Sequence, residues 1–165
     1  MPDPLAIANT SPLLYLHQAG CLNILKGLYG YVIVPRAVQG ELEEGSRQGF
    51  DVPDVTALEW LQVRPVASAV LVPALIDLGP GEAEVIALGL ELANSLLILD
   101  DQLARRIANL RNLKYTGTLG VLVRAKRAGL ISSVSAVVAT LRGKGMWLSD
   151  AVLEAALRLS GEQLE

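Results

Sequence analysis

Short apolar segments alternate with helical stretches along this chain, and the alternation restricts the fold more than any other feature of the sequence. Runs typical of strands occupy residues 5–8, 31–34, 60–63, 95–99 and 114–115. Helical segments are expected at 11–20, 22–28, 35–44, 68–77, 82–93, 101–110, 117–127, 134–141 and 149–159. A chain that passes repeatedly from strand to helix forms a parallel sheet with helices on both faces. The sequence therefore predicts an α/β fold in which helices sandwich a parallel β-sheet in three layers, α/β/α.

Length and composition fit a fold of this kind. The chain has 165 residues, of which 52% are hydrophobic, and this is enough for a full hydrophobic core. We expect a single domain over residues 1–165, with residues 130–165 forming a C-terminal helical extension. Aromatic residues make up 4% of the chain, which argues against a sheet that stacks RNA bases on Phe and Tyr.

The sequence also indicates where the protein works. Its one cysteine, Cys21, cannot form an internal disulfide and is typical of a reducing compartment. No stretch approaches the roughly 20 continuous apolar residues of a membrane span. Residues 1–9 carry acid and proline rather than a basic segment followed by a long apolar one, so we expect no secretory signal and a cytoplasmic location.

The charged residues are divided unevenly along the chain. Residues 1–101 contain 13 Asp or Glu and 4 Lys or Arg, whereas residues 102–149 contain no acid. The second segment holds nine bases: Arg105, Arg106, Arg111, Lys114, Arg124, Lys126, Arg127, Arg142 and Lys144. Such a division suits a protein that binds a metal with one half and a polyanion with the other. The solvated faces of ordinary surface helices would explain the same pattern.

Polar side chains directly follow two of the predicted strands. Asn9, Thr10 and Ser11 come after the first strand, and Asp100 and Asp101 come after the fourth. The carboxyl ends of parallel strands form the edge at which α/β sheets bind ligands. Adjacent carboxylates repel each other unless a cation or a base neutralises them. An N-cap role for Asp100 is the alternative, and it leaves the second carboxylate unexplained.

Helix periodicity separates the two acids at the start of the 82–93 segment. The residues on the same side of the helix as Glu82 are apolar or small: Val85, Ile86, Gly89 and Ala93. Glu84 shares its side with Leu88 and Glu91 and is expected to lean toward water. A carboxylate at the end of a core-facing stripe needs a partner, and a metal is one. The dipole of a helix that begins behind Pro80 is the other explanation for Glu82.

The 35–44 segment contains a second acid that is expected to face inward. Glu41 lies on the apolar side of Ala37 and Val38, whereas Glu43 is expected on the solvent side. A partly buried acid paired with a base would account for Glu41 equally well.

Together these positions predict a metal site built from oxygen atoms. The residues expected to converge on one edge of the sheet are Asn9, Glu41, Glu82 and Asp100 or Asp101. Oxygen ligands alone suit Mg²⁺ or Mn²⁺.

Five segments, in their order along the chain, resemble the PIN-domain family, which includes the toxin ribonucleases of bacterial and archaeal toxin–antitoxin pairs. They are Ala8-Asn9-Thr10-Ser11-Pro12-Leu13, Val34-Pro35 to Glu41-Leu42, Gly79-Pro80-Gly81-Glu82-Ala83-Glu84, Leu97-Ile98-Leu99-Asp100-Asp101 and Thr116-Gly117-Thr118-Leu119-Gly120. The closing Trp147-Leu148-Ser149-Asp150 segment resembles the end of a less characterised PIN-like branch.

The resemblance implies a PIN-like, metal-dependent endoribonuclease with Mg²⁺ or Mn²⁺ as its cofactor. The family's four acidic metal positions fall on Asn9, Glu41, Glu82 and Asp100. Asp101 is an alternative or a supplement to Asp100, and Glu41, Glu82 and Asp100 are the implied catalytic carboxylates. The residues that match hydroxyls orienting the ligands or the substrate are Thr10, Ser11 and Thr118. Active members typically have Asp where this chain has Asn9, which brings no charge, so the affinity for metal is expected to fall.

The predicted reaction is hydrolysis of an RNA phosphodiester bond, in which the metal polarises a phosphoryl oxygen and activates a water. Arg105 and Arg106 lead the bases that are expected to bind the RNA phosphates in a salt-dependent way. The resemblance further implies a toxin with a cognate antitoxin protein, and a homodimer.

Two other functions fit parts of the pattern. A catalytically weak or inert PIN-like module that binds RNA or a protein is supported by Asn9. A receiver-type signalling domain also carries an acidic pair on a doubly wound sheet, but that pair lies near the first strand, whereas Asp100 and Asp101 come late in this chain.

Overall fold

The computed structural model describes residues 3–68, 77–146 and 148–162. Within these residues five strands form one parallel sheet: β1 (Leu5–Ala8), β2 (Val32–Pro35), β3 (Leu61–Arg64), β4 (Ser95–Ile98) and β5 (Lys114–Thr116). The strand order is β3-β2-β1-β4-β5, so the chain reverses its direction of travel across the sheet after β3. β1 lies at the centre, and such a reversal is where α/β sheets bind ligands.

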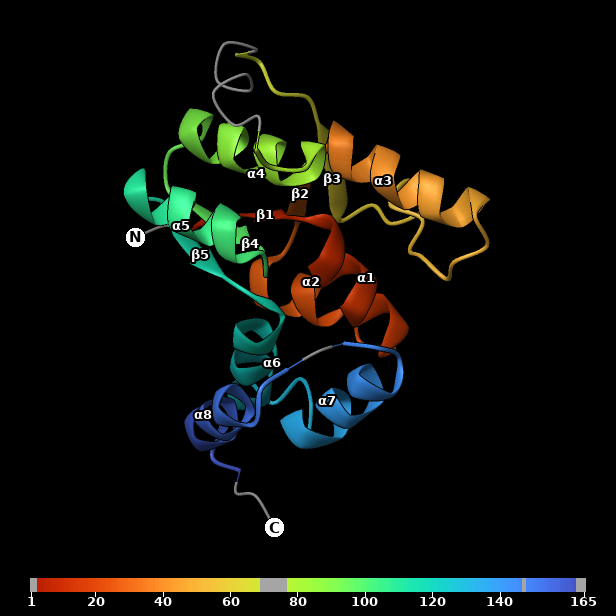
Figure 1. Cartoon of the computed structure of the whole chain (residues 1–165), viewed down its shortest axis with the longest axis vertical. Coiled ribbons are helices and arrows are strands. Elements are labelled where there is room, and N and C mark those ends of the chain that lie inside the picture. Colours follow the sequence, from red (N-terminus) through yellow and green to blue (C-terminus); the bar gives the residue numbers. More distant parts are fainter. Residues whose placement is uncertain (1–2, 69–76, 147, 163–165) are drawn as a thin grey trace.

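Helices cover both faces of this sheet, which confirms the predicted three-layer α/β/α fold (Figure 1). The helices in the described residues are α1 (Thr10–Gln18), α2 (Ile24–Tyr29), α3 (Arg36–Arg47), α4 (Pro80–Glu91), α5 (Gln102–Leu110), α6 (Thr118–Arg127), α7 (Val134–Gly143) and α8 (Asp150–Ser160). One face carries α3, α4 and α5, and the other carries α1, α2 and α6. Among the described residues, no helix has both the length and the apolar character needed to cross a membrane.

The strands read as continuous apolar runs because both faces of the sheet are covered. Ile7, Ile33, Leu97 and Ile98 are all fully buried. Branched aliphatic side chains fit this environment because their stiff χ1 angles pack well on a pleated surface.

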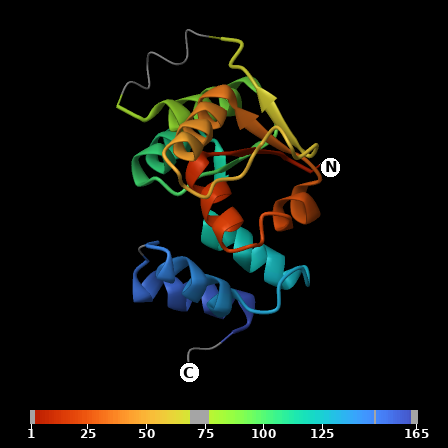
Figure 2. The same cartoon turned by 90° about the vertical axis from the view of Figure 1, so that its right-hand side faces the viewer.

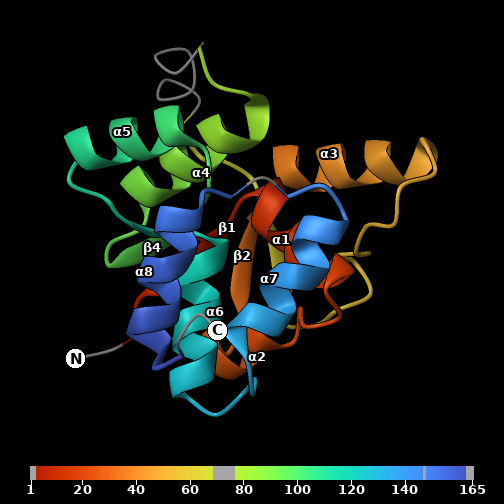
Figure 3. The ribbon, with the colours of Figure 1, turned by 60° about the horizontal axis from the view of Figure 1, so that its bottom comes forward.

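The C-terminal helices α7 and α8 lie outside α6, away from the sheet (Figures 2 and 3). Ser149 caps α8 by accepting a hydrogen bond from the backbone N–H of Val152 at 3.3 Å, as the sequence predicts. Leu153 and Leu157 are buried against the core, whereas Leu159 is 59% exposed. The apolar residues of the last helix are therefore divided between the core and the surface.

Several helix boundaries differ from the prediction by a few residues, including those of α1 and α3. α1 begins at Thr10 with Asn9 as its N-cap residue, rather than with Ser11. α3 continues through Gly45 to Arg47, where the Arg47 guanidinium bonds Glu44 at 2.7 Å and supports the last turn. Most of the helix predicted at 68–77 lies outside the described residues.

Candidate active site

The register of the sheet brings three chain segments to one edge. Ala8 pairs with Ile98, so Asn9 and Asp100 leave the sheet from neighbouring strands. β2 pairs with β1 on the other side, and α3 starts directly where β2 ends. Asn9 therefore lies between the strand that leads to Glu41 and the strand that leads to Asp100.

The first group of residues at this edge is here called the Glu41 cluster. It consists of Asn9, Thr10, Glu41, Gly81, Glu82 and Glu84. Thr10 at the start of α1 donates its hydroxyl hydrogen to Glu41 Oε1 at 2.8 Å. Gly81 in the first turn of α4 is so close that a Cβ on it would collide with Glu41 Oε1 and lie 3.0 Å from Asn9 Oδ1. The oxygens of Asn9 and Glu41 thus lie against the same point of the α4 backbone.

Asn9 has an unusual environment for an amide. Its side chain is 2% exposed, and its Oδ1 has no hydrogen-bond partner among the described residues. It occupies the N-cap position of α1 without making a side-chain cap bond. A buried acceptor left unpaired costs about 1–3 kcal/mol, so an oxygen in this position calls for a cation or a donor that approaches from outside the chain.

The carboxylates around Glu41 concentrate more negative charge than the nearby hydrogen-bond donors neutralise. Burial raises the pKa of Glu41, and the neighbouring carboxylates of Glu82 and Glu84 raise it further. The Thr10 hydroxyl and the Gly81 backbone N–H act in the opposite direction but do not outweigh these effects. A cation bound here would relieve both the desolvation and the repulsion.

The structure corrects one prediction about these acids. Glu84 was expected to lean toward water, but it is half-buried, and its Oε1 accepts the backbone N–H of Ala37 at 2.9 Å. The first turn of α3 packs against α4, and its orphan N–H group takes the carboxylate as a partner. Glu43 is exposed on the outer side of α3, as predicted.

Glu82 lies in the first turn of α4, and its carboxylate folds back over the start of the helix. Its Oε2 lies 2.5 Å from the position that a Cβ on Gly79, the N-cap residue, would take. The side chain is half-buried, so Glu82 both complements the helix dipole and adds negative charge beside Glu41.

The second group at this edge, the Asp100 cluster, consists of Asp100, Arg105, Gly117 and Thr118. Thr118 donates its backbone N–H to Asp100 Oδ1 at 2.8 Å and its hydroxyl hydrogen to Oδ2 at 2.7 Å. The Arg105 guanidinium lies 3.8 Å from Oδ1. Both oxygens of Asp100 are therefore held at the start of α6.

Asp101 plays the part that the sequence offered as an alternative for Asp100. It is the N-cap of α5, and its Oδ2 accepts the backbone N–H of Ala104 at 2.8 Å. The adjacent carboxylates thus point to different helix N-termini, which separates their charges.

The bases of the second half have several different partners. Arg105 donates from Nε to the Leu99 carbonyl at 2.9 Å and lies over the Tyr115 ring, with 5.2 Å from its Cζ to the ring centroid. Arg106 is exposed on α5. Lys126 and Arg127 bond the carbonyls of Ser132 and Leu159 and so hold the C-terminal helices to α6.

The predicted oxygen ligands are thus brought together in part. The structure places Asn9, Glu41 and Glu82 in one group and keeps Asp100 in a neighbouring group. In the described part of the chain, no set of three or more His, Cys, Asp or Glu side chains is grouped so as to hold a metal ion. The unpaired amide oxygen of Asn9 beside the crowded Glu41 carboxylate nevertheless fits a hard cation such as Mg²⁺ or Mn²⁺.

Sequence reasoning identified Asn9, Glu41 and Asp100 at this edge but missed Gly81. The signal was present in the Gly79-Pro80-Gly81 run, where a second glycine inside the first helical turn has no use as a turn residue. Such a glycine indicates close approach by another part of the chain.

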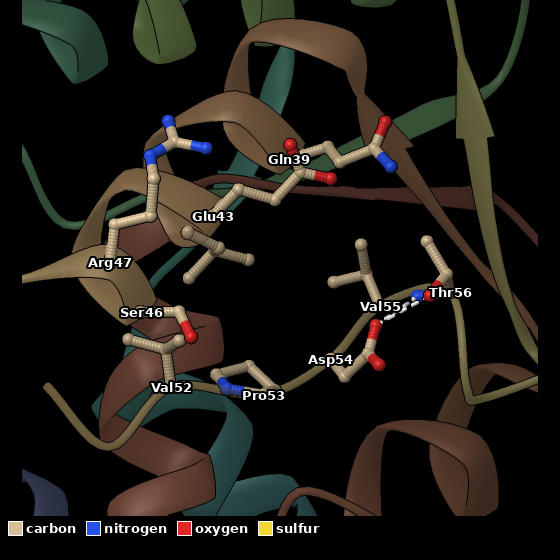
Figure 4. Close-up of a pocket in the computed structure, with 10 residues that line it drawn as sticks. Gln39, Glu43, Ser46, Arg47, Val52, Pro53, Asp54, Val55 and Thr56 are labelled. Carbon is tan, nitrogen blue, oxygen red and sulfur yellow. Dashed lines mark hydrogen bonds between the residues drawn. The ribbon is translucent and has the colours of Figure 1, made fainter. Parts of the chain in front are cut away.

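Two of the cavities among the described residues show how far the candidate site extends. One, of about 510 Å³, has Asp100 and Arg105 in its wall. The other, of about 420 Å³, lies on the outer side of α3, between Gln39 and Arg47 on the helix and the loop around Asp54 (Figure 4). The second cavity contains none of the predicted ligands, so the site and the outer face of α3 are separate surfaces.

A doubly wound parallel sheet covered by helices on both faces, with acids at its carboxyl edge, places the chain in the class of three-layer α/β domains. The PIN-domain family model matches residues 5–162, and the chain belongs to this family. PIN domains are nuclease-type domains that generally use divalent metals. No curated protein matches the chain.

Proposed function

We propose that this protein is an endoribonuclease that hydrolyses RNA phosphodiester bonds with Mg²⁺ or Mn²⁺. The observation that carries the proposal is the buried Asn9 Oδ1 without a partner, placed against the same glycine as a carboxylate of raised pKa. The fold leaves these oxygens without enough donors, and a divalent cation would supply the missing charge.

In this proposal the chain's residues have separate roles. Asn9, Glu41, Glu82 and Asp100 are the metal ligands, and Asp101 supports Asp100 by capping α5. Thr10 orients Glu41 and Thr118 orients Asp100 through the hydrogen bonds described above. Contacts with the RNA are assigned in this proposal to Arg105, Arg106 and Ser11. A divalent ion held by these residues would supply polarisation of a phosphoryl oxygen and a water of lowered pKa.

The biological setting is proposed by family analogy. The protein would act in the cytoplasm as a homodimeric toxin, held inactive by a small cognate antitoxin.

The test is cleavage of a labelled single-stranded RNA with Mn²⁺. We expect Glu41→Gln, Glu82→Ala and Asp100→Ala to lose about 100-fold or more in rate. Glu43→Gln is the matched control, because Glu43 is exposed on the same helix as Glu41. Equal cleavage by the native chain and all the variants would show that the acids are not the active site.

A PIN-like module that binds RNA or protein without cutting is the second candidate, and Asn9 favours it. An amide in place of a carboxylate weakens metal binding and cannot act as a base. RNA binding by the native chain together with no cleavage at any Mn²⁺ concentration would support this candidate.

A further inference from the structure

The cavity of about 510 Å³ beside Asp100 is closed on one side by the C-terminal part of the chain. Met146, Leu148 and Val152, from the segment before α8 and from its first turn, line it together with Asp100 and Arg105.

The lining combines flat apolar surface with a few polar groups. Tyr15 and Tyr115 contribute aromatic rings, and Leu148 and Val152 contribute aliphatic surface. Gln102 and Ser149 add side chains that both donate and accept hydrogen bonds. Mostly apolar cavities of roughly 300–1,000 Å³ with a few polar groups are typical of small-ligand sites.

Charge and position indicate what would occupy it. Asp100, which belongs to the proposed reaction centre, forms part of the cavity wall, so an occupant would lie beside that centre. Arg105 lies over the Tyr115 ring, which is 39% exposed, and presents a cation at the same opening. An aromatic ring beside a guanidinium is the combination on which unpaired bases stack.

We infer that this cavity binds one unpaired nucleobase of the RNA, next to the bond that is cut, and that Met146, Leu148 and Val152 determine specificity for it. This inference rests on the proposed ribonuclease function. A base held in a duplex would have to leave its stack to enter such a cavity, so the cavity selects single-stranded RNA.

The test is binding of short RNA without metal, so that no cleavage occurs. A fluorescein-labelled hexaribonucleotide is compared, by anisotropy, with hexamers that carry one abasic ribose at each position in turn and with a duplex. The native chain should lose about tenfold in affinity when one particular base is absent, because stacking of one base contributes that much. It should also bind the duplex more weakly than the single strand.

Val152→Trp fills the cavity from a position that is 50% exposed and should abolish the dependence on that base. Leu159→Trp is the matched control, since Leu159 is 59% exposed at the far end of the same helix. If Val152→Trp does not fold, as judged by circular dichroism, Tyr115→Leu decides the question by removing the ring. Retention of the base dependence in the deciding variant would overturn the inference.

The outcomes separate this inference from the proposed function. If the native chain cleaves RNA but binds abasic and complete hexamers equally, the proposed base-binding role of the cavity is wrong. The proposed hydrolysis would then still stand. Base-dependent binding by a chain that never cleaves would leave the cavity intact and reject the hydrolysis. Failure to bind any hexamer would overturn the inference and make a protein segment the better occupant.

Discussion

Glu41 and Glu162 are both carboxylates that the fold partly withdraws from water, and their surroundings have opposite effects. Burial would raise the pKa of Glu162, but hydrogen bonds from the backbone N–H groups of Val134 and Ser135 and from two serine hydroxyls lower it to about 2. Lys126 lies 3.4 Å from its Oε2. Glu41 has the Thr10 hydroxyl and the Gly81 N–H, and two further carboxylates nearby keep its pKa raised.

The difference separates a carboxylate whose charge the fold compensates from one whose charge it does not. Glu162 sits at the N-terminus of α7, where orphan N–H groups and a positive dipole end favour an anion. Around Glu41 the fold instead concentrates acids and leaves Asn9 Oδ1 unpaired. Asp100 is intermediate, because Thr118 satisfies both of its oxygens while Arg105 remains beside it.

The largest expected effect comes from Gly81→Ala. This substitution tests whether the uncompensated oxygens around Glu41 are needed for activity. The new methyl group would displace the oxygens of Glu41 and Asn9. We expect a loss of about 100-fold in kcat/KM for RNA cleavage with Mn²⁺, since misplacement by about 1 Å has effects of that size.

The matched control is Gly40→Ala, next to Glu41 on α3, where an added Cβ meets nothing within 4 Å. It should cleave at the native rate. Similar activity of the two alanine variants would show that Asn9 and Glu41 need not lie against α4.

Glu162→Gln tests whether the compensated charge of Glu162 stabilises the fold. A carboxylate whose pKa is lowered from 4.5 to about 2 stabilises the fold above the unfolded value, and this stabilisation disappears as the pH falls toward 2. We expect the unfolding free energy at pH 7 to drop by about 1–3 kcal/mol, measured by urea denaturation, with the difference shrinking between pH 4.5 and 2.

Glu154→Gln, at an exposed position on α8, should change the stability little at either pH. A loss for Glu162→Gln that does not depend on pH would mean that the charge of Glu162 has no part in the effect.

Asn9→Asp adds a negative charge beside Glu41, where the fold already supplies too few hydrogen-bond donors. It therefore enlarges the difference between Glu41 and Glu162. The Kd for Mn²⁺, measured by calorimetry, should fall about tenfold, because the number of charged ligands tunes the affinity for hard cations. Without metal the variant should melt below the native protein, since a third neighbouring carboxylate repels Glu41. Asn23→Asp, at the exposed N-cap of α2, is the control and should leave metal binding unchanged.

The smallest effect is expected for Glu41→Gln without metal. A raised pKa means that ionisation of Glu41 opposes folding. The protonated carboxyl group therefore contributes stability below the unfolded pKa of 4.5, and this contribution is lost as the pH rises above it. The amide keeps an acceptor for Thr10 and removes the charge. The melting temperature at pH 7 should rise by roughly 1–3 °C, and the gain should vanish at pH 4.

Glu43→Gln on the same helix is the control for this measurement and should show no gain at pH 7. A lower melting temperature for Glu41→Gln at neutral pH would show that the Glu41 charge is already compensated in the metal-free protein.

The order of strands and helices could be read from the sequence because it depends on local patterns. Fully covered parallel strands need continuous apolar runs, and glycines, prolines and caps mark the ends of the helices between them. Asn9 and Asp100 were placed at one edge for the same reason, since each directly follows such a run. Helix phase also turned Glu43 outward correctly.

Helix phase failed for Glu84 because the phase of one helix does not reveal what packs against it. The N-terminus of α3 lies against α4, and its free N–H group drew Glu84 inward. Local sequence likewise did not decide between Asp100 and Asp101, since either residue suits an N-cap. The hydrogen bond from the Ala104 backbone N–H identifies Asp101 as the N-cap, whereas Asp100 contacts Thr118, 18 residues later in the chain.

The sequence by itself therefore determined the α/β architecture and the edge of the sheet at which Asn9 and the acids gather. Only the tertiary structure decided which of their oxygens are left without donors. Strand and helix formation depend on neighbours along the chain, whereas the hydrogen-bond partners of a carboxylate are N–H groups and charges brought in by other elements. Asn9, Glu41 and Gly81 come from three separate segments that meet at one point. The shortage of donors for Asn9 and Glu41 arises from that packing.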